Sequence, residues 1–166
     1  MRHVLPAVRT VVVLAAVLLP AVPAQAQRAV LLVRHAERLD ASKDSPLSPA
    51  GEQRAAALAT MLADAGITAI YTTEYQRTIK TAEPLAARLK IQAVRTGTGT
   101  DEVVARMKQE HPAGVVLVVG HSNTLPAIIK ALGVNDPIAI ADDEYSNLFI
   151  VTPRDGGSAT LMRLRF

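Results

Sequence analysis

The sequence predicts an α/β fold, a three-layer sandwich with a mainly parallel sheet, helices on both faces and a C-terminal hairpin at the sheet. Continuous apolar runs, such as residues 29–33 and 115–119, are typical of strands buried on both faces. These runs alternate with longer segments of helical periodicity, the pattern of a largely parallel sheet. Two final apolar segments, 147–152 and 159–165, flank a turn containing Pro153 and two glycines and predict the hairpin.

The first half of the chain is expected to contain two strands and two helices. Their expected ranges are 29–33 for the first strand, 49–65 for the first helix, 67–71 for the second strand and 74–90 for the second helix. Ser48 and Pro49 fit an N-cap and the first helical position, and Gly66 fits a helix stop. Pro84 lies inside the second helix and predicts a kink or a break there.

The second half continues the alternation up to the hairpin. The expected ranges are 91–94 for a short strand, 101–110 for a helix, 115–119 for the most buried strand and 124–132 for a helix. Thr100 or Asp101 can cap the third helix. The two glycines of residues 96–100 belong to a flexible loop and do not form a dinucleotide-binding fingerprint. The acidic residues 142–144 are expected in a surface loop.

The chain of 166 residues is long enough for one domain and opens with the pattern of a secretory signal peptide. Arg2 and Arg9 are its positive residues, residues 11–19 are its apolar stretch, and Ala24-Gln25-Ala26 offers a cleavage site. We therefore expect a leader over 1–26, a single domain over 27–166, and a periplasmic or secreted protein. The alternative is an uncleaved membrane anchor, although the apolar stretch is shorter than a spanning helix requires.

The composition excludes several classes of protein. The chain has no cysteine, which rules out disulfides, thiolate metal sites and a lipoprotein anchor. No clustered Lys/Arg run of the kind that binds nucleic acid is present. Cleavage of the leader would remove two arginines and no acidic residue, so the formal net charge of +3 overstates the basicity of the mature chain. We expect neither a nucleic-acid partner nor membrane association after cleavage.

Cationic side chains stand where predicted strands end. Arg34 and His35 follow the strand over 29–33, and His121 follows the strand over 115–119. Arg77 lies near the start of the helix that follows the second strand. Ligands of open α/β sheets bind at the carboxyl ends of strands, and arginine suits a phosphate. Because neighbours on a regular strand point to opposite faces, Arg34 and His35 can converge only if the strand end turns.

Three segments carry these residues in a characteristic order. They are Leu32-Val33-Arg34-His35-Ala36-Glu37, the run from Tyr71 to Ala82 that contains Arg77, and Val119-Gly120-His121-Ser122-Asn123-Thr124. Together they resemble the histidine phosphatase superfamily, also called phosphoglycerate mutase-like. Ala36 after the first histidine is similar to the small phosphohistidine-phosphatase-like branch. Ser122 departs from the acid-phosphatase branch, in which an aspartate follows the second histidine.

The resemblance implies a catalytic role for each of these two arginines and two histidines. His35 would be the nucleophile that forms a phosphohistidine, with one ring nitrogen held as N–H by a backbone carbonyl. Arg34, Arg77 and His121 would bind the phosphate. From the residues themselves, two nearby arginines disfavour a charged imidazole and keep His35 neutral. The resemblance implies that no metal or other cofactor is needed.

The proton donor for the leaving group remains open at this point. The family places a carboxylate after the strand that follows the second arginine motif, and Asp101 and Glu102 match that region. Asp101 could instead only cap its helix. Glu37 is a second candidate, or it could orient Arg34. Residues 142–144, which are all acidic, are a more distant third choice.

The leading hypothesis is an exported, metal-independent phosphatase that hydrolyses phosphate monoesters through a phosphohistidine on His35. Its partner would be a phosphorylated small molecule, an envelope sugar or a phosphoprotein. One alternative is a non-catalytic module that binds phosphate or phosphoglycans, and another is a phosphotransferase of the phosphoglycerate mutase type. A metal hydrolase using His35, Glu37 and His121 is less well supported, because the chain has no His-Glu-x-x-His helix.

Overall fold

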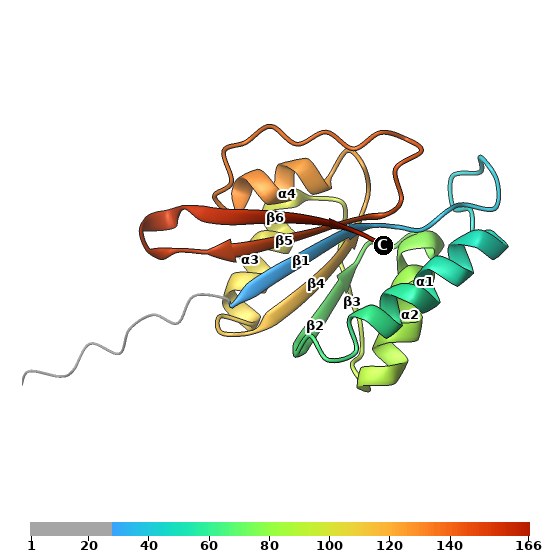
Figure 1. Cartoon of the computed structure of the whole chain (residues 1–166), viewed down its shortest axis with the longest axis horizontal. Coiled ribbons are helices and arrows are strands. Elements are labelled where there is room, and N and C mark those ends of the chain that lie inside the picture. Colours follow the sequence, from blue (N-terminus) through green and yellow to red (C-terminus); the bar gives the residue numbers. More distant parts are fainter. Residues whose placement is uncertain (1–27) are drawn as a thin grey trace, which may run out of the picture.

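The computed structural model describes residues 28–166, which form one sheet with helices packed on both of its faces (Figure 1). The predicted leader over 1–26 lies outside the described residues. Within residues 28–166, no helix is long and apolar enough to cross a membrane.

The sheet has six strands in the spatial order β3-β2-β4-β1-β5-β6. The strands are β1 (Ala29–Arg34), β2 (Ile67–Thr72), β3 (Val94–Arg95), β4 (Val115–Gly120), β5 (Asn147–Pro153) and β6 (Ala159–Arg165). The first four strands in the chain pair in parallel, whereas β5 pairs antiparallel with both β1 and β6. This arrangement confirms the mainly parallel sheet and its C-terminal hairpin.

The central strands β1 and β4 bring two distant segments of the chain together. Their register pairs Ala29 with Val115 and continues to Arg34 and Gly120. The backbone N–H of His35 extends the ladder by donating to the carbonyl of Gly120 at 2.9 Å. His35 and His121, which follow the two strands, therefore emerge side by side at the carboxyl edge of the sheet.

The helices form the two outer layers and separate two apolar cores. Helices α1 (Pro49–Met61) and α2 (Gln76–Leu89) pack against one another on one face, where Leu31, Leu58 and Leu85 are buried. Helices α3 (Thr100–Glu110) and α4 (Leu125–Ala131) cover the other face. Strand residues of alternate parity feed each core, as expected for a sheet buried on both sides.

Helix α1 differs from the sequence expectation at its C-terminal end. It begins as expected, with the hydroxyl of Ser48 accepting from the N–H of Gly51, but it ends at Met61 rather than near residue 65. Turns then lead to Gly66, whose φ of 68° is in the left-handed region. Met61, the last residue of the helix, is 42% exposed.

Three further sequence expectations can be compared with the structure. Helix α2 continues through Pro84, so the chain does not break there, because packing on the sheet and on α1 outweighs the one backbone hydrogen bond that proline removes. The third strand lies at Val94–Arg95 instead of 91–94. Gly99, rather than Thr100 or Asp101, is the N-cap residue of α3, and no side chain caps that helix.

Candidate active site

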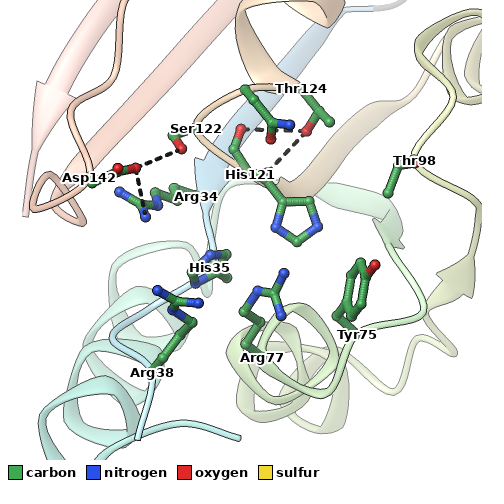
Figure 2. Close-up of a pocket in the computed structure, with 11 residues that line it drawn as sticks. Arg34, His35, Arg38, Tyr75, Arg77, Thr98, His121, Ser122, Thr124 and Asp142 are labelled. Carbon is green, nitrogen blue, oxygen red and sulfur yellow. Dashed lines mark hydrogen bonds and ion pairs between the residues drawn. The ribbon is translucent and has the colours of Figure 1, made fainter. Parts of the chain in front are cut away.

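The carboxyl edge of the sheet carries a cavity of about 550 Å³ in which the two arginines and two histidines of the sequence motifs meet (Figure 2). Arg34 and His35 come from the end of β1, Arg77 from the first turn of α2, and His121 from the end of β4. The complete lining is Arg34, His35, Arg38, Tyr75, Arg77, Thr98, His121, Ser122, Asn123, Thr124 and Asp142. The strand end turns after Arg34, which allows both Arg34 and His35 to face the same cavity.

His35 is buried, with 3% of its surface exposed, and its orientation is fixed by the backbone. Its Nδ1 lies 2.8 Å from the carbonyl oxygen of Ala36, which can only accept a hydrogen bond. The proton is therefore on Nδ1, and Nε2 keeps its lone pair. The N–H of Ala36 in turn donates to the hydroxyl of Thr81 at 2.9 Å, so α2 helps to hold this turn in place.

Burial and the surrounding positive charges keep His35 neutral. Burial is the largest cause, and His121, Arg34 and Arg77 add to it, together lowering the pKa of His35 from 6.5 to about 3 despite the opposing hydrogen bond to Ala36. The sequence had indicated the arginines as the cause. The structure gives the same direction, but the exclusion of water from the ring is the dominant effect.

Arg34 is buried and held on two sides. Its Nη1 donates to the carbonyl of Ala141 at 2.7 Å, and its Nη2 lies 3.8 Å from Oδ1 of Asp142. The ring of Tyr145 stacks on the guanidinium, 4.4 Å from its central carbon. The buried Nε–H has no hydrogen-bond partner among the described residues.

Arg77 is held in a similar way from the opposite side of the cavity. Its Nη1 donates to the carbonyl of Lys43 at 2.8 Å, and its central guanidinium carbon lies 4.3 Å from the ring centroid of Tyr75. Its buried Nε–H also has no hydrogen-bond partner within residues 28–166. Two fixed guanidinium groups at one cavity suit an oxyanion such as phosphate.

His121 is buried and lies edge-on to His35, with the ring centroids 5.3 Å apart. Its Nε2 is 3.1 Å from the hydroxyl oxygen of Thr73, on the side of the ring away from His35. Burial, with smaller contributions from Arg77 and Arg34, lowers the pKa of His121 from 6.5 to about 4. The ring is therefore neutral at physiological pH.

The carboxylates do not lie where the sequence placed them. Asp101 and Glu102 are exposed in the first turn of α3 and do not line the cavity, because the preceding loop presents Thr98 there. Glu37 makes a bidentate pair with Arg54, at distances of 2.6 to 3.0 Å, and does not orient Arg34. Burial alone would raise the pKa of Glu37, but the hydrogen bonds from Arg54 outweigh it and lower that pKa.

Asp142 is the carboxylate in the cavity lining, from the loop that the sequence offered as its third choice. Its side chain is 97% exposed and accepts a hydrogen bond from the hydroxyl of Ser122 at 3.4 Å. The long loop that leads to β5 brings it over Arg34. That placement is a tertiary effect, since more than 100 residues separate Asp142 from Arg34 in the sequence.

Sequence reasoning missed the rim of the cavity. Arg38 is exposed, and its guanidinium points toward the centre beside His35 and Arg77 (Figure 2). Ser122 and Asn123, which follow the second histidine, supply further polar groups. Their position directly after a motif histidine was the available signal. For Arg38 the only signal in the sequence was its position, three residues after His35 and close to Arg34.

The described part of the chain contains no group of three or more His, Cys, Asp or Glu side chains that could hold a metal ion. The carboxylate of Glu37, which the metal-hydrolase alternative needed as a ligand, is paired with Arg54. The positive charge at the cavity comes from arginine side chains.

Comparison with known proteins agrees with this geometry. The sequence profile of the histidine phosphatase superfamily (branch 1) matches residues 30–99, a segment that contains Arg34, His35 and Arg77. No curated protein sequence matches the chain significantly.

Several solved structures share the fold. The protein histidine phosphatase SixA, complexed with tungstate, is 19% identical, with a TM-score of 0.67 over 82% of this chain and 96% of that one. The mycobacterial glucosyl-3-phosphoglycerate phosphatase Rv2419c is 15% identical, with a TM-score of 0.66 over 84% of this chain and 98% of that one. The product of the Mycobacterium tuberculosis open reading frame Rv3214 is 18% identical, with a TM-score of 0.64 over 84% and 97% of the two chains.

The ordered motifs, the profile match and the shared fold lead to one family. The two histidines and two arginines that the motifs supply lie around one cavity, at the sheet edge where the fold positions a ligand. Residues 30–99 of the chain match the histidine phosphatase superfamily (branch 1), and the fold of residues 28–166 is similar to that of solved phosphatases such as SixA.

Proposed function

We propose that this protein is a metal-independent phosphatase that hydrolyses phosphate monoesters through a phosphohistidine on His35. The observation that carries the proposal is the hydrogen bond from His35 Nδ1 to the carbonyl of Ala36, at 2.8 Å. It fixes the ring so that Nε2 presents a lone pair. A neutral, pre-oriented imidazole among fixed arginines is the arrangement that nucleophilic attack on phosphorus requires.

In the first step, His35 Nε2 attacks the phosphorus and forms an N–P bond. The P–O bond to the leaving group breaks, and its electron pair stays on the leaving oxygen, which takes up a proton. In the second step, water attacks the phosphohistidine and the N–P bond breaks. Its electron pair returns to Nε2, and inorganic phosphate and a proton are released.

The arginines supply the electrostatic part of this reaction. A phosphate monoester carries about −1.5 to −2 charges near neutral pH. Arg34 and Arg77 are positioned by backbone carbonyls and tyrosine rings and keep their buried Nε–H donors unused. Donors fixed before the reaction stabilise the developing charge at little reorganisation cost. Arg38 at the rim adds positive potential that favours entry of an anionic substrate.

We assign transfer of the proton to the leaving oxygen to Asp142. It is the carboxylic side chain of the cavity lining, and it lies beside Arg34, close to where the phosphoryl group would bind. Asp101, Glu102 and Glu37 are not assigned this role, because the first two are outside the lining and the third is paired with Arg54.

We further propose that the substrate is a phosphorylated compound met outside the cytoplasm, such as an envelope sugar, another phosphorylated small molecule or a phosphoprotein. The leader pattern in residues 1–26 supports export, and the polar, open rim supports a hydrophilic substrate. A phosphotransferase of the mutase type is not favoured by any feature of the cavity.

The test of this proposal is hydrolysis of p-nitrophenyl phosphate, whose good leaving group makes little demand on the proton donor. We expect turnover by the wild-type protein in the presence of EDTA and a loss of at least about 1,000-fold in His35→Ala, as for removal of a catalytic nucleophile. His111→Ala is the matched control, because His111 follows α3 and lies outside the cavity.

Trapping the intermediate completes the test. Rapid acid-free quenching with labelled substrate should leave phosphate on the wild-type protein and on His111→Ala, but not on His35→Ala. The proposal fails if His35→Ala keeps full activity. It also fails if wild-type protein binds phosphate but turns over no ester, which is the behaviour of a binding module.

A further inference from the structure

Two buried hydroxyl groups form a chain behind His121, on the side away from His35. The hydroxyl oxygen of Thr73 lies 3.1 Å from Nε2 of His121 and 2.9 Å from the hydroxyl oxygen of Thr78. The Thr78 hydroxyl also lies 2.9 Å from the carbonyl of Tyr75. Both threonines are buried, so their contacts are made with protein groups.

The chain of hydroxyls matters because His121 is neutral and carries one N–H. If that proton is on Nε2, then Nδ1, which lies on the side of the ring facing His35 and Arg34, offers a lone pair to the phosphate (Figure 2). A lone pair facing an anion is repulsive. If the proton is on Nδ1, the ring donates a hydrogen bond to the phosphate, and Nε2 must accept one from its neighbour.

The hydroxyls can be ordered in two directions, and both satisfy every group. In one direction His121 Nε2–H donates to Thr73, Thr73 donates to Thr78, and Thr78 donates to the carbonyl of Tyr75. In the other, Thr78 donates to Thr73 and Thr73 donates to His121 Nε2. The Tyr75 carbonyl loses nothing essential in the second order, because it still accepts from the backbone N–H groups of Thr78 and Ile79, at 3.0 and 3.2 Å.

We propose that Thr73, supported by Thr78, is a positioning residue that holds His121 as the Nδ1–H tautomer when a phosphoryl group is bound. The inference rests on the proposed function, since it assumes that the transferred phosphoryl group occupies the cavity. The anion selects the second order of the hydroxyl chain. Thr73 then donates to His121 Nε2, and His121 Nδ1–H donates to a phosphoryl oxygen.

The test compares Thr73→Val, which keeps the shape of the side chain and removes the hydroxyl, with Thr73→Ser, which restores it. With p-nitrophenyl phosphate we expect kcat to fall about 10- to 100-fold in Thr73→Val. This is the range for loss of a hydrogen bond to a charged group, here the bond from His121 Nδ1–H to the phosphoryl oxygen. Thr73→Ser should recover most of that loss. Thr78→Val should have a smaller effect, because Thr73 keeps its own proton.

Thr72→Val is the matched control, since Thr72 is the adjacent buried threonine. Its hydroxyl has no hydrogen-bond partner among the described residues, so its removal should leave kcat unchanged and stability equal or higher. Thermal melts of all the variants show whether each is folded.

The tautomer itself can be read by ¹⁵N NMR of the histidine rings with tungstate or inorganic phosphate bound. We expect the proton of His121 on Nδ1 in wild-type protein and in Thr73→Ser, and at least partly on Nε2 in Thr73→Val. The inference is overturned if anion-bound wild-type protein carries the proton on Nε2, or if Thr73→Val matches Thr72→Val in kcat. Either result leaves the phosphohistidine mechanism standing, because that depends on His35→Ala.

Discussion

At the scale of single residues, the site depends on a few side chains whose ordinary chemistry is changed by burial. His35 and His121 are neutral because water is excluded from their rings and arginines face them. Arg34 and Arg77 keep unused donors because backbone carbonyls and tyrosine rings occupy their other sides. Each of these properties can be measured separately.

Acid should destabilise the protein partly through the two cavity histidines. Their folded-state pKa values, about 3 and about 4, lie below the ordinary value of 6.5, so the unfolded chain binds more protons in between. The stabilisation they provide is complete above about pH 6.5 and is lost as the pH falls toward 3. Thermal melts from pH 7.5 to 4 should show a shallower decline in His121→Gln than in wild-type protein.

His111→Gln is the control for that series, since His111 lies outside the cavity. Its melting temperature should fall with pH as steeply as that of the wild-type protein. A decline in His121→Gln that parallels both would show that His121 is protonated as readily in the folded state as in the unfolded one.

The role of Asp142 is separable from that of the nucleophile through the leaving group. An alkoxide leaving group needs a proton far more than p-nitrophenolate does. Asp142→Asn should therefore lower the rate of hydrolysis of an alkyl phosphate at least about tenfold more than that of p-nitrophenyl phosphate. Steady-state kcat/KM for the two esters measures this ratio. An equal loss on both esters would show that Asp142 only orients Arg34, and Asp143→Asn serves as the control from the same exposed loop.

At the scale of elements, the nucleophile depends on how the loop after β1 is held. The N–H of Ser48 donates to the carbonyl of Glu37 at 2.9 Å, and Thr81 of α2 accepts from Ala36. Arg54 of α1 forms a hydrogen-bonded ion pair with the Glu37 side chain and also donates to the carbonyl of Phe166. Two helices and the C-terminal residue therefore converge on the turn that presents His35.

Gly51 of α1 lies against the backbone of that loop at Glu37. A Cβ atom at this position would overlap the carbonyl oxygen of Glu37, a backbone atom that cannot move aside cheaply. Gly51→Ala should therefore cost about 1–3 kcal/mol of unfolding free energy, the usual range for overpacking, and lower kcat by moving the turn at His35. Chemical denaturation and p-nitrophenyl phosphate kinetics measure the two effects.

The control for that substitution is Gly97→Ala, where an added Cβ would meet only the end of a flexible side chain, Glu102, at 3.5 Å. We expect its stability to be close to that of the wild-type protein. If Gly51→Ala were equally harmless, the contact between α1 and the loop would not be what fixes the nucleophile.

At the scale of the whole molecule, the sheet order brings the motif residues to one place. Strands β1 and β4 are neighbours although 80 residues lie between them, and the helices α1 to α4 form the two outer layers. Strand β5 pairs antiparallel with β1, so the N-terminal end of β5 lies at the carboxyl end of β1. The loop that precedes β5 therefore reaches the carboxyl edge of the sheet. That loop supplies Ala141, Asp142 and Tyr145 to Arg34.

The proposed export can be tested through residues 1–26. If residues 1–26 are a signal peptide, the protein recovered from an exporting bacterial host begins at Gln27, and intact mass spectrometry would show that loss. Replacing Ala24 and Ala26 with bulky residues should block cleavage, because the peptidase needs small side chains there. Recovery of a full-length, cytoplasmic wild-type protein would contradict export.

The sequence by itself determined the α/β class, the order of the elements and the four motif residues, three at strand ends and Arg77 at the start of a helix. These are local properties, since apolar periodicity, Ser48 with Pro49, and the position of a histidine after a buried run can be read without any long-range contact. Local rules erred where packing decides, as at the end of α1, which lies at Met61 rather than near residue 65, and at the N-cap of α3, which is Gly99.

Only the tertiary structure decided which groups surround those four residues. The sequence suggested that Asp101 or Glu102 would reach the phosphate, but the first turn of α3 leaves both outside the cavity lining and a distant loop brings Asp142 instead. The same holds for three other sets of contacts. They are the pair of Glu37 with Arg54, the tyrosine rings that stack on the two arginines, and the hydroxyl next to His121 Nε2. Each depends on side-chain orientation or on contacts between segments that lie apart in the chain. Periodicity cannot encode such contacts, because they depend on how packed elements place their loops.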